Sequence, residues 1–123
     1  MLAKRLDDLH RKVERDGRRF ERLPLARQHQ VRKRLKRLRY LAELTASLWS
    51  GHAVQTWLKR VSAAQDALGH HNDVAVAADA FRADARAHPA AWFAAGFLQA
   101  HLAVTARAAR KALVRTLDEK RFW

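Results

Sequence analysis

Hydrophobic residues recur along the chain at intervals of three and four, the spacing of one face of an α-helix. The first stripe consists of Leu2, Leu6, Leu9 and Val13. It predicts a helix from about residue 2 to 16 that ends at Gly17. The segment "GRRFERLP" that follows is expected to be a linker, and Pro24 stands where a second helix can begin.

The second stripe predicts a helix from about residue 25 to 50, with Gly51 as its stop. At 100° per residue, its apolar members fall within a wedge of about 80°. They are Val31, Leu35, Leu38, Ala42, Thr45 and Trp49.

The rest of the chain predicts three more helices, at about residues 52–68, from about residue 73, and at about 90–117. Gly69 is expected to end the third helix, and "HHND" is expected to be a turn in which Asn72 or Asp73 caps the fourth. The residues expected to join the core from these helices are Val54, Trp57, Leu58, Val61, Leu68, Val74, Ala77, Ala78, Phe81, Trp92, Phe93, Phe97 and Val104.

These stripes predict an all-α fold, an up-and-down bundle of four to five antiparallel helices that forms a single domain over residues 1–123. The connections are short, which places consecutive helices side by side and antiparallel. Only 4 Gly and 2 Pro interrupt the sequence, and no strand-like alternation persists.

Charge adds a functional constraint, because the chain carries a formal net charge of +13. A charge of this size indicates a polyanionic partner such as nucleic acid, an anionic membrane surface or another phosphate polymer. The absence of cysteine excludes disulfides, thiolate metal sites and cysteine nucleophiles. No apolar run approaches the roughly 20 residues that span a bilayer, so no membrane insertion is expected. The location expected is the cytoplasm.

The cations are concentrated in the second helix, where every charged residue between Glu21 and Glu43 is positive. A solvated helix face would normally mix signs at i±4. Several of these residues step by three or four on the side opposite the apolar wedge, over about 16 Å at 1.5 Å per residue. The residues expected to bind an anion are His29, Arg32, Lys33, Lys36, Arg37, Arg39 and Tyr40. An ordinary exposed histidine is an equally good interpretation of His29.

Two segments resemble the CHAD family, the conserved histidine α-helical domain. In "HQVRKRLKRLRYLAEL", the family's pattern is matched at His29, Arg32, Lys33, Lys36, Arg39, Tyr40 and Glu43. In "LKRVSAAQDALGHHNDVAV" it is matched at Gln65, Leu68, Gly69, Asn72 and Asp73, while Ala64 stands where leucine is usual. The closing "RFW" is similar to the end of that domain, and the resemblance extends over nearly the whole chain.

The resemblance implies a non-catalytic helical domain that binds inorganic polyphosphate and associates with polyphosphate granules, without a cofactor. Members of the family usually contain two similar bundles around a basic cavity, in a chain about twice as long. This sequence resembles the C-terminal bundle alone. Two arrangements would complete the cavity: a partner half in a longer chain, or two paired copies of this chain. For this chain by itself, a homodimer is expected.

Other residues have competing interpretations. His70, His71 and Asp73 could suggest a metal site, but a helix cap is the better interpretation and no metal is expected. A second wall of the anion site is predicted at Lys59, Arg60, Arg107, Arg110, Lys111 and Arg115. Trp57 and Trp92 are interpreted as core residues rather than base-stacking platforms.

Two other functions compete with polyphosphate binding. Nucleic-acid binding suits the charge equally well, although no recognisable reading module is present. A metal-dependent polyphosphate or triphosphate hydrolase would need clustered carboxylates beside the cations. The cationic segment offers only Glu43, so the expectation is that the protein is not an enzyme.

Overall fold

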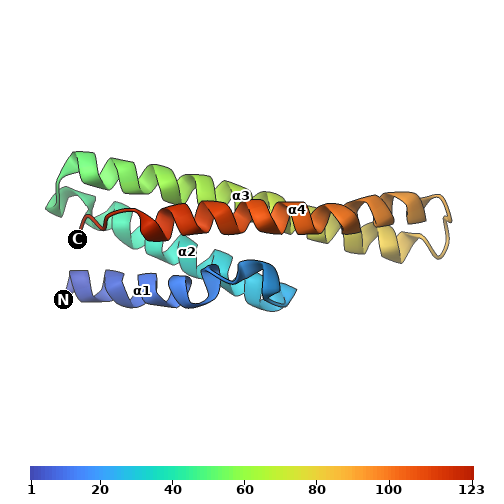
Figure 1. Cartoon of the computed structure of the whole chain (residues 1–123), viewed down its shortest axis with the longest axis horizontal. Coiled ribbons are helices and arrows are strands. Elements are labelled where there is room, and N and C mark those ends of the chain that lie inside the picture. Colours follow the sequence, from blue (N-terminus) through green and yellow to red (C-terminus); the bar gives the residue numbers. More distant parts are fainter.

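The computed structural model describes residues 1–123 and contains four α-helices. They are α1 (Leu2–Gly17), α2 (Leu25–Thr45), α3 (Gly51–Asp84) and α4 (Ala91–Asp118). Two short 3-10 helices, η1 (Phe20–Arg22) and η2 (Ala46–Leu48), lie in the connections. Successive helices run in opposite directions (Figure 1), so the predicted all-α up-and-down bundle is confirmed. None of the helices contains a stretch long and apolar enough to span a bilayer.

The main difference from the sequence prediction is α3, a single helix where two helices and a turn were expected. Gly69 does not adopt the positive φ of a helix-ending glycine, and Asn72 and Asp73 lie within the helix rather than capping one. Buried residues continue through this region in steps of three and four, at Val61, Ala64, Leu68, His71, Ala75 and Ala78. Packing of this stripe outweighs the roughly 1 kcal/mol that glycine costs inside a helix.

The end of the second helix also differs from the prediction. α2 ends at Thr45, and the chain reaches α3 through η2. Gly51 is therefore the first residue of α3 instead of the stop of α2. The antiparallel order of the two helices is unaffected.

The core lies where all four helices run side by side. Its largest fully buried side chains are Trp57, Phe20, Leu6, Leu35, Leu38, Leu68 and Leu113. Phe20 belongs to the segment predicted as a linker, where η1 inserts its ring into the bundle. Trp57 is buried, as predicted.

The last residues of the chain fasten α4 to α1. Phe122 and Trp123 pack edge-on against Trp57, with ring centroids 5.5 and 5.4 Å away. Trp123 Nε1 and Arg121 Nη1 both donate to Asp7 Oδ1, at 2.8 and 2.9 Å. The aromatic ending of the sequence therefore has a structural role in closing the bundle.

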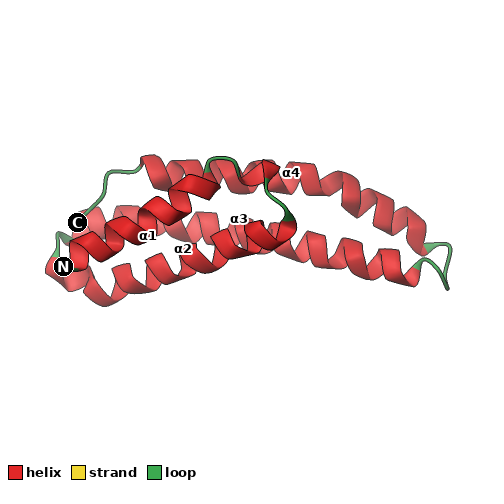
Figure 2. Cartoon of the chain, turned by 90° about the horizontal axis from the view of Figure 1, so that it is seen from below, coloured by secondary structure: helices red, strands yellow, loops and turns green.

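α3 and α4 continue well beyond the ends of α1 and α2 as a two-helix arm (Figures 1 and 2). We call residues 76–104 the distal hairpin. Five residues predicted for the core lie on its surface with exposed fractions of 42–83%. They are Phe81, Trp92, Phe93, Phe97 and Val104. That prediction was wrong because these side chains lie outside the contact between α3 and α4, in which the buried side chains of this part of the arm are alanines.

Two histidines are buried in the bundle, and burial lowers the pKa of both. The pKa of His10 falls below its ordinary 6.5 because the ring is desolvated and because the positive charge of Arg121 is nearby. Neither His10 ring nitrogen has a hydrogen-bond partner in the protein. Burial, and then the neighbouring His70, lower the pKa of His71. Both rings are therefore neutral in the folded protein near neutral pH.

These pKa shifts predict that the protein loses stability as the pH falls from about 7.5 toward 5.5. The unfolded chain takes up protons at His10 and His71 near pH 6.5, whereas the folded chain does so only at lower pH. Their contribution to stability is thus complete above pH 6.5 and is lost below it. H10L removes an unpaired buried polar ring, so it should flatten the dependence of Tm on pH without lowering Tm at pH 7.5. H52Q alters an exposed histidine and serves as the control; equal slopes in the two variants would contradict the prediction.

Candidate anion-binding surface

Two sets of contacts fix the orientation of α2. Its stripe of buried residues packs in the core, and two of its arginines bind the carboxylate of Asp16. The Asp16 side chain is fully buried at the end of α1. Arg34 Nη1 donates to it at 3.0 Å and Arg27 Nη2 at 3.3 Å, both from α2. Arg19 Nη2, from the connection, donates at 3.3 Å. Two of the cations in the basic segment therefore join α2 to α1.

The ionisation of Asp16 follows from these contacts. Burial by itself would raise the pKa of the carboxyl, but the hydrogen bond from Arg19 and the charge and hydrogen bond of Arg27 outweigh it. The pKa of Asp16 is held below its ordinary value of 3.8, and the group is a carboxylate at neutral pH. It neutralises part of the positive charge on the inner side of α2.

The remaining cations of α2 fall into two groups. Arg39 is engaged with Glu43, at 2.8 Å between Nε and Oε1, and with Gln65 of α3. Four others have no carboxylate within 4.0 Å of their charged nitrogens, namely Arg32, Lys33, Lys36 and Arg37. Lys36 Nζ lies 5.7 Å from the ring centre of the exposed Tyr40. The structure thus separates structural arginines from a run of unpaired cations on the same helix.

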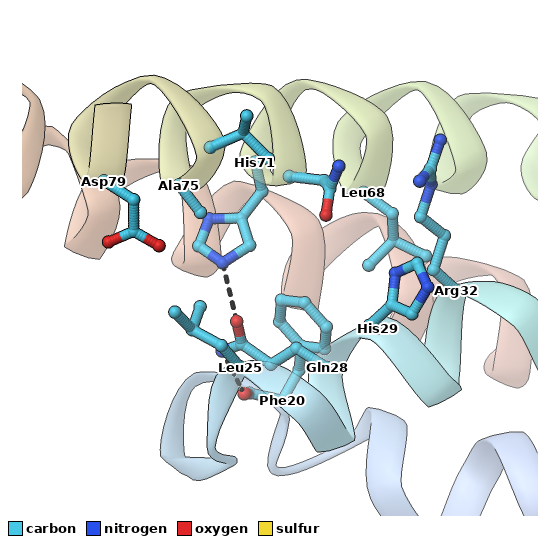
Figure 3. Close-up of a pocket in the computed structure, with 11 residues that line it drawn as sticks. Phe20, Leu25, Gln28, His29, Arg32, Leu68, His71, Ala75 and Asp79 are labelled. Carbon is cyan, nitrogen blue, oxygen red and sulfur yellow. Dashed lines mark hydrogen bonds between the residues drawn. The ribbon is translucent and has the colours of Figure 1, made fainter. Parts of the chain in front are cut away.

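A pocket of about 180 Å³ opens at the seam between α2 and α3 (Figure 3). His29 and Arg32 line it from α2, and Leu68 and His71 line it from α3. Two of the residues predicted to bind an anion therefore share one concave site. Asn72, which belongs to the second family segment, lines the same pocket.

Buried polar groups from three helices hold the wall of this pocket in place. Gln28 Nε2 donates to the carbonyl oxygen of Phe20 at 3.0 Å, which leaves its Oε1 to accept from His71 Nε2 at 2.8 Å. The other ring nitrogen of His71, Nδ1, lies 2.7 Å from the hydroxyl of Thr105 on α4. Because the neutral ring carries its proton on Nε2, Nδ1 accepts a hydrogen bond from that hydroxyl. His71 thereby fixes α2 and α4 relative to α3.

The sequence prediction missed His71, which was interpreted as part of a turn. The signal that could have identified it is the stripe of buried residues, which keeps its helical steps from Leu68 through His71 to Ala75. A histidine in such a stripe requires polar partners when buried. The sequence does not reveal that these are Gln28 and Thr105, because they are 43 and 34 residues away.

The structure does not join the predicted second wall to the cations of α2. Arg60 binds Glu119 at 3.3 Å, and Arg110 is paired with Glu21. The other residues named for this wall, Lys59, Arg107, Lys111 and Arg115, are exposed on α3 and α4. α4 packs mainly against α3, with smaller contacts to α1 and η1, so its outer stripe faces away from α2.

Helix α1 instead supplies cations next to α2. A shallow groove of about 830 Å³ between the two helices is lined by Lys4, Arg5, Lys12 and Arg37. Asp8 is the one carboxylate in its lining, and Arg11 already binds it at 3.3 Å. Arg37 thus faces the α1 side of the surface, while His29 and Arg32 face the α3 side. The α1 cations were missed because helical spacing does not show which helix lies beside which.

The surface holds no arrangement typical of a metal centre, since no three His, Asp or Glu side chains are grouped to hold an ion. His70 and His71 point in different directions along α3, with one exposed and the other buried. What the geometry defines is a helical bundle with an outer cationic surface formed by α2 and bordered by α1 and α3.

The CHAD domain family matches residues 1–82, two thirds of the chain, and the protein belongs to this family. The match includes both segments on which the resemblance was based. It ends before α4, so the similarity of the closing "RFW" lies outside it. No curated protein and no solved structure matches the chain.

Because Arg34 binds Asp16 and Lys33 has no carboxylate partner, replacing these neighbouring cations should change the stability of the protein by different amounts. R34Q removes a donor from the buried Asp16 and should lower the free energy of unfolding by about 1–2 kcal/mol. K33Q alters an exposed cation without a partner and should change it by less than about 0.5 kcal/mol. Urea unfolding followed by circular dichroism measures both. D16N should cost about 3 kcal/mol, because it leaves several arginines around a neutral buried group. Equal stability of R34Q and K33Q would contradict the assignment.

Proposed function

We propose that this protein binds inorganic polyphosphate, without catalysing its turnover, through the outer surface of α2. The observation that carries the proposal is the run of four unpaired cations, Arg32, Lys33, Lys36 and Arg37, on a helix whose other arginines are paired. Like charges held together without counterions favour binding of a polyanion. Membership of the CHAD family, which is associated with polyphosphate, supports the same ligand.

The side chains on this surface suit a linear chain of phosphates. Arg32 and Arg37 can each donate two parallel hydrogen bonds to phosphate oxygens, while Lys33 and Lys36 act as mobile point charges. Tyr40, which is 52% exposed, can donate its hydroxyl at the end of the run. His29 supplies a further donor at the mouth of the seam pocket.

We further propose that the protein acts in the cytoplasm and associates with polyphosphate granules. It corresponds to one bundle of the two-bundle family domain, and a second copy of the chain is its other proposed partner. The α1 groove, with Lys4, Arg5 and Lys12, widens the surface on which a long polymer can lie.

A charge-matched pair of triple variants tests the location of the binding surface. R32Q/K33Q/K36Q removes three cations from α2, and R107Q/K111Q/R115Q removes three from the outer stripe of α4. The α2 variant should weaken polyphosphate binding by about 10- to 100-fold, at roughly 0.5–1 kcal/mol for each exposed contact. The α4 variant should stay within about threefold of the parent, because it lowers only the overall field.

Fluorescence anisotropy with labelled polyphosphate measures both affinities at several salt concentrations. The α2 variant should also show a flatter dependence of affinity on salt, since fewer counterions are released on binding. Equal losses in the two variants would mean that the protein responds to net charge alone. Circular dichroism of both variants checks that the fold is retained.

Competition and turnover experiments separate this function from the two alternatives. Unlabelled polyphosphate should displace the labelled polymer at lower phosphate concentration than single-stranded RNA or duplex DNA at the same salt. Stronger displacement by a nucleic acid would favour the nucleic-acid alternative. Incubation with polyphosphate and Mg²⁺ or Mn²⁺ should release no phosphate. Metal-dependent release that persists in purified protein would favour the hydrolase.

A further inference from the structure

The distal hairpin has its large apolar side chains on the outside. Phe93 is 83% exposed, Phe97 66% and Phe81 42%. The side chains buried between the two helices are small, namely Ala78, Ala85, Ala91 and Ala95. A two-helix arm that needed no further partner would bury its phenylalanines between the two helices and expose its alanines. The arrangement is that of a pair of helices that packs against a further layer.

Phe81 of α3 and the two phenylalanines of α4 lie on one face of the arm, whereas Trp92 lies outside this face, beside Asp79 and Arg82. Phe93, Phe97 and Val104 lie on one stripe of α4, at steps of four and seven residues. The ring of Phe97 is stacked on His101, at 6.2 Å between centroids, and His101 meets His70 of α3 edge-on at 6.3 Å. Phe81 lies three helical turns beyond His70 and so on the same side of α3.

A polar network borders this face. Arg82 donates to Asp79 at 3.0 Å on its own helix and to Gln99 of α4 at 2.5 Å. The same two α3 residues share a concave surface with Arg86 and Trp92. The arm therefore has one largely apolar face and a second surface on which this polar network lies beside the exposed Trp92.

We propose that the apolar face of the distal hairpin binds the same face of a second copy of this chain. The two arms would form a four-helix layer with two-fold symmetry, in which each phenylalanine stripe covers the other. This assigns a surface to the self-association proposed above. It does not depend on polyphosphate binding by α2.

Charge identifies the second copy as the occupant. The chain as a whole carries +13, which opposes association of identical molecules. Residues 76–104 contain two acids, Asp79 and Asp84, and two arginines, Arg82 and Arg86, so the distal hairpin has no net charge. It is the part of the molecule where two copies can meet without bringing their cationic surfaces together. An anionic partner would be expected on the charged end instead.

The size of the face predicts a weak dimer. Three phenylalanines at these exposures offer on the order of 400 Å² per copy. Two copies would thus bury on the order of 800 Å² from these rings, and Val104 and the flanking alanines add to it. That is below the roughly 1,200 Å² of stable interfaces and in the range of weak, transient ones, so a dissociation constant in the micromolar range or weaker is expected.

Sedimentation velocity over a range of protein concentrations, without polyphosphate, measures the dimer. F93E/F97E places two carboxylates on the face and should raise the dissociation constant by at least about tenfold. L44E/L48E introduces the same charge at two exposed leucines of the other end, 81% and 63% exposed, and should leave dimerisation unchanged or slightly stronger. All four positions are exposed, so both variants should fold.

Cross-linking locates the contact, because the chain contains no cysteine of its own. A100C adds one thiol between Phe97 and Val104 on the apolar stripe, and S47C adds one at the opposite end of the molecule. A short bis-maleimide should give cross-linked dimers with A100C and not with S47C. The reverse result would place the contact elsewhere and overturn the proposal.

A monomer at all concentrations would also overturn the proposal. Flotation with vesicles of anionic and of neutral lipid then identifies one other occupant. Binding to vesicles that F93E/F97E abolishes would assign the face to a membrane surface. Loss of polyphosphate binding in the α2 variant is a separate result, since sedimentation is measured without the polymer.

Discussion

The arrangement of the bundle depends on one buried carboxylate. Asp16 ends α1 with its side chain fully buried, and arginines from the connection and from α2 surround it. A buried carboxylate is stable only when it is paired and hydrogen-bonded. Arg27 and Arg34 therefore have to face α1, which leaves Arg32, Lys33 and Lys36 on other sides of the same helix.

The few carboxylates of this strongly basic chain lie mainly where one element contacts another. Asp7 binds Arg121 near the C-terminus, Glu119 binds Arg60, and Glu21 binds Arg110. The outer surface of α2 has little such compensation, with Glu43 engaged by Arg39 at one end. Repulsion concentrated there raises the free energy of the unbound surface, and a bound polyanion would relieve it.

The molecule consequently has two ends with different physical properties. Where four helices run together, large aliphatic and aromatic residues fill the core and cations cover the outside. Beyond the ends of α1 and α2, α3 and α4 continue as an arm (Figure 1). This arm has no net charge and exposes phenylalanine. The hydrogen bonds of His71 to Gln28 and Thr105 lie close to the boundary between these parts. Binding of a polyanion and association with another protein molecule can therefore occupy separate surfaces.

The sequence by itself determined the helical class, the position of α1, the start of α2 and the concentration of cations on α2, because these follow from periodicity and from local charge. It did not determine the length of α3, since the glycine and the polar "HHND" resemble a helix end unless the partners of His71 are known. Only the tertiary structure decided which cations were free, because Asp16 lies 11 and 18 residues from the α2 arginines it binds. It also decided that Phe93 and Phe97 are exposed. Helical spacing identifies an apolar face but cannot show whether another helix is long enough to cover it.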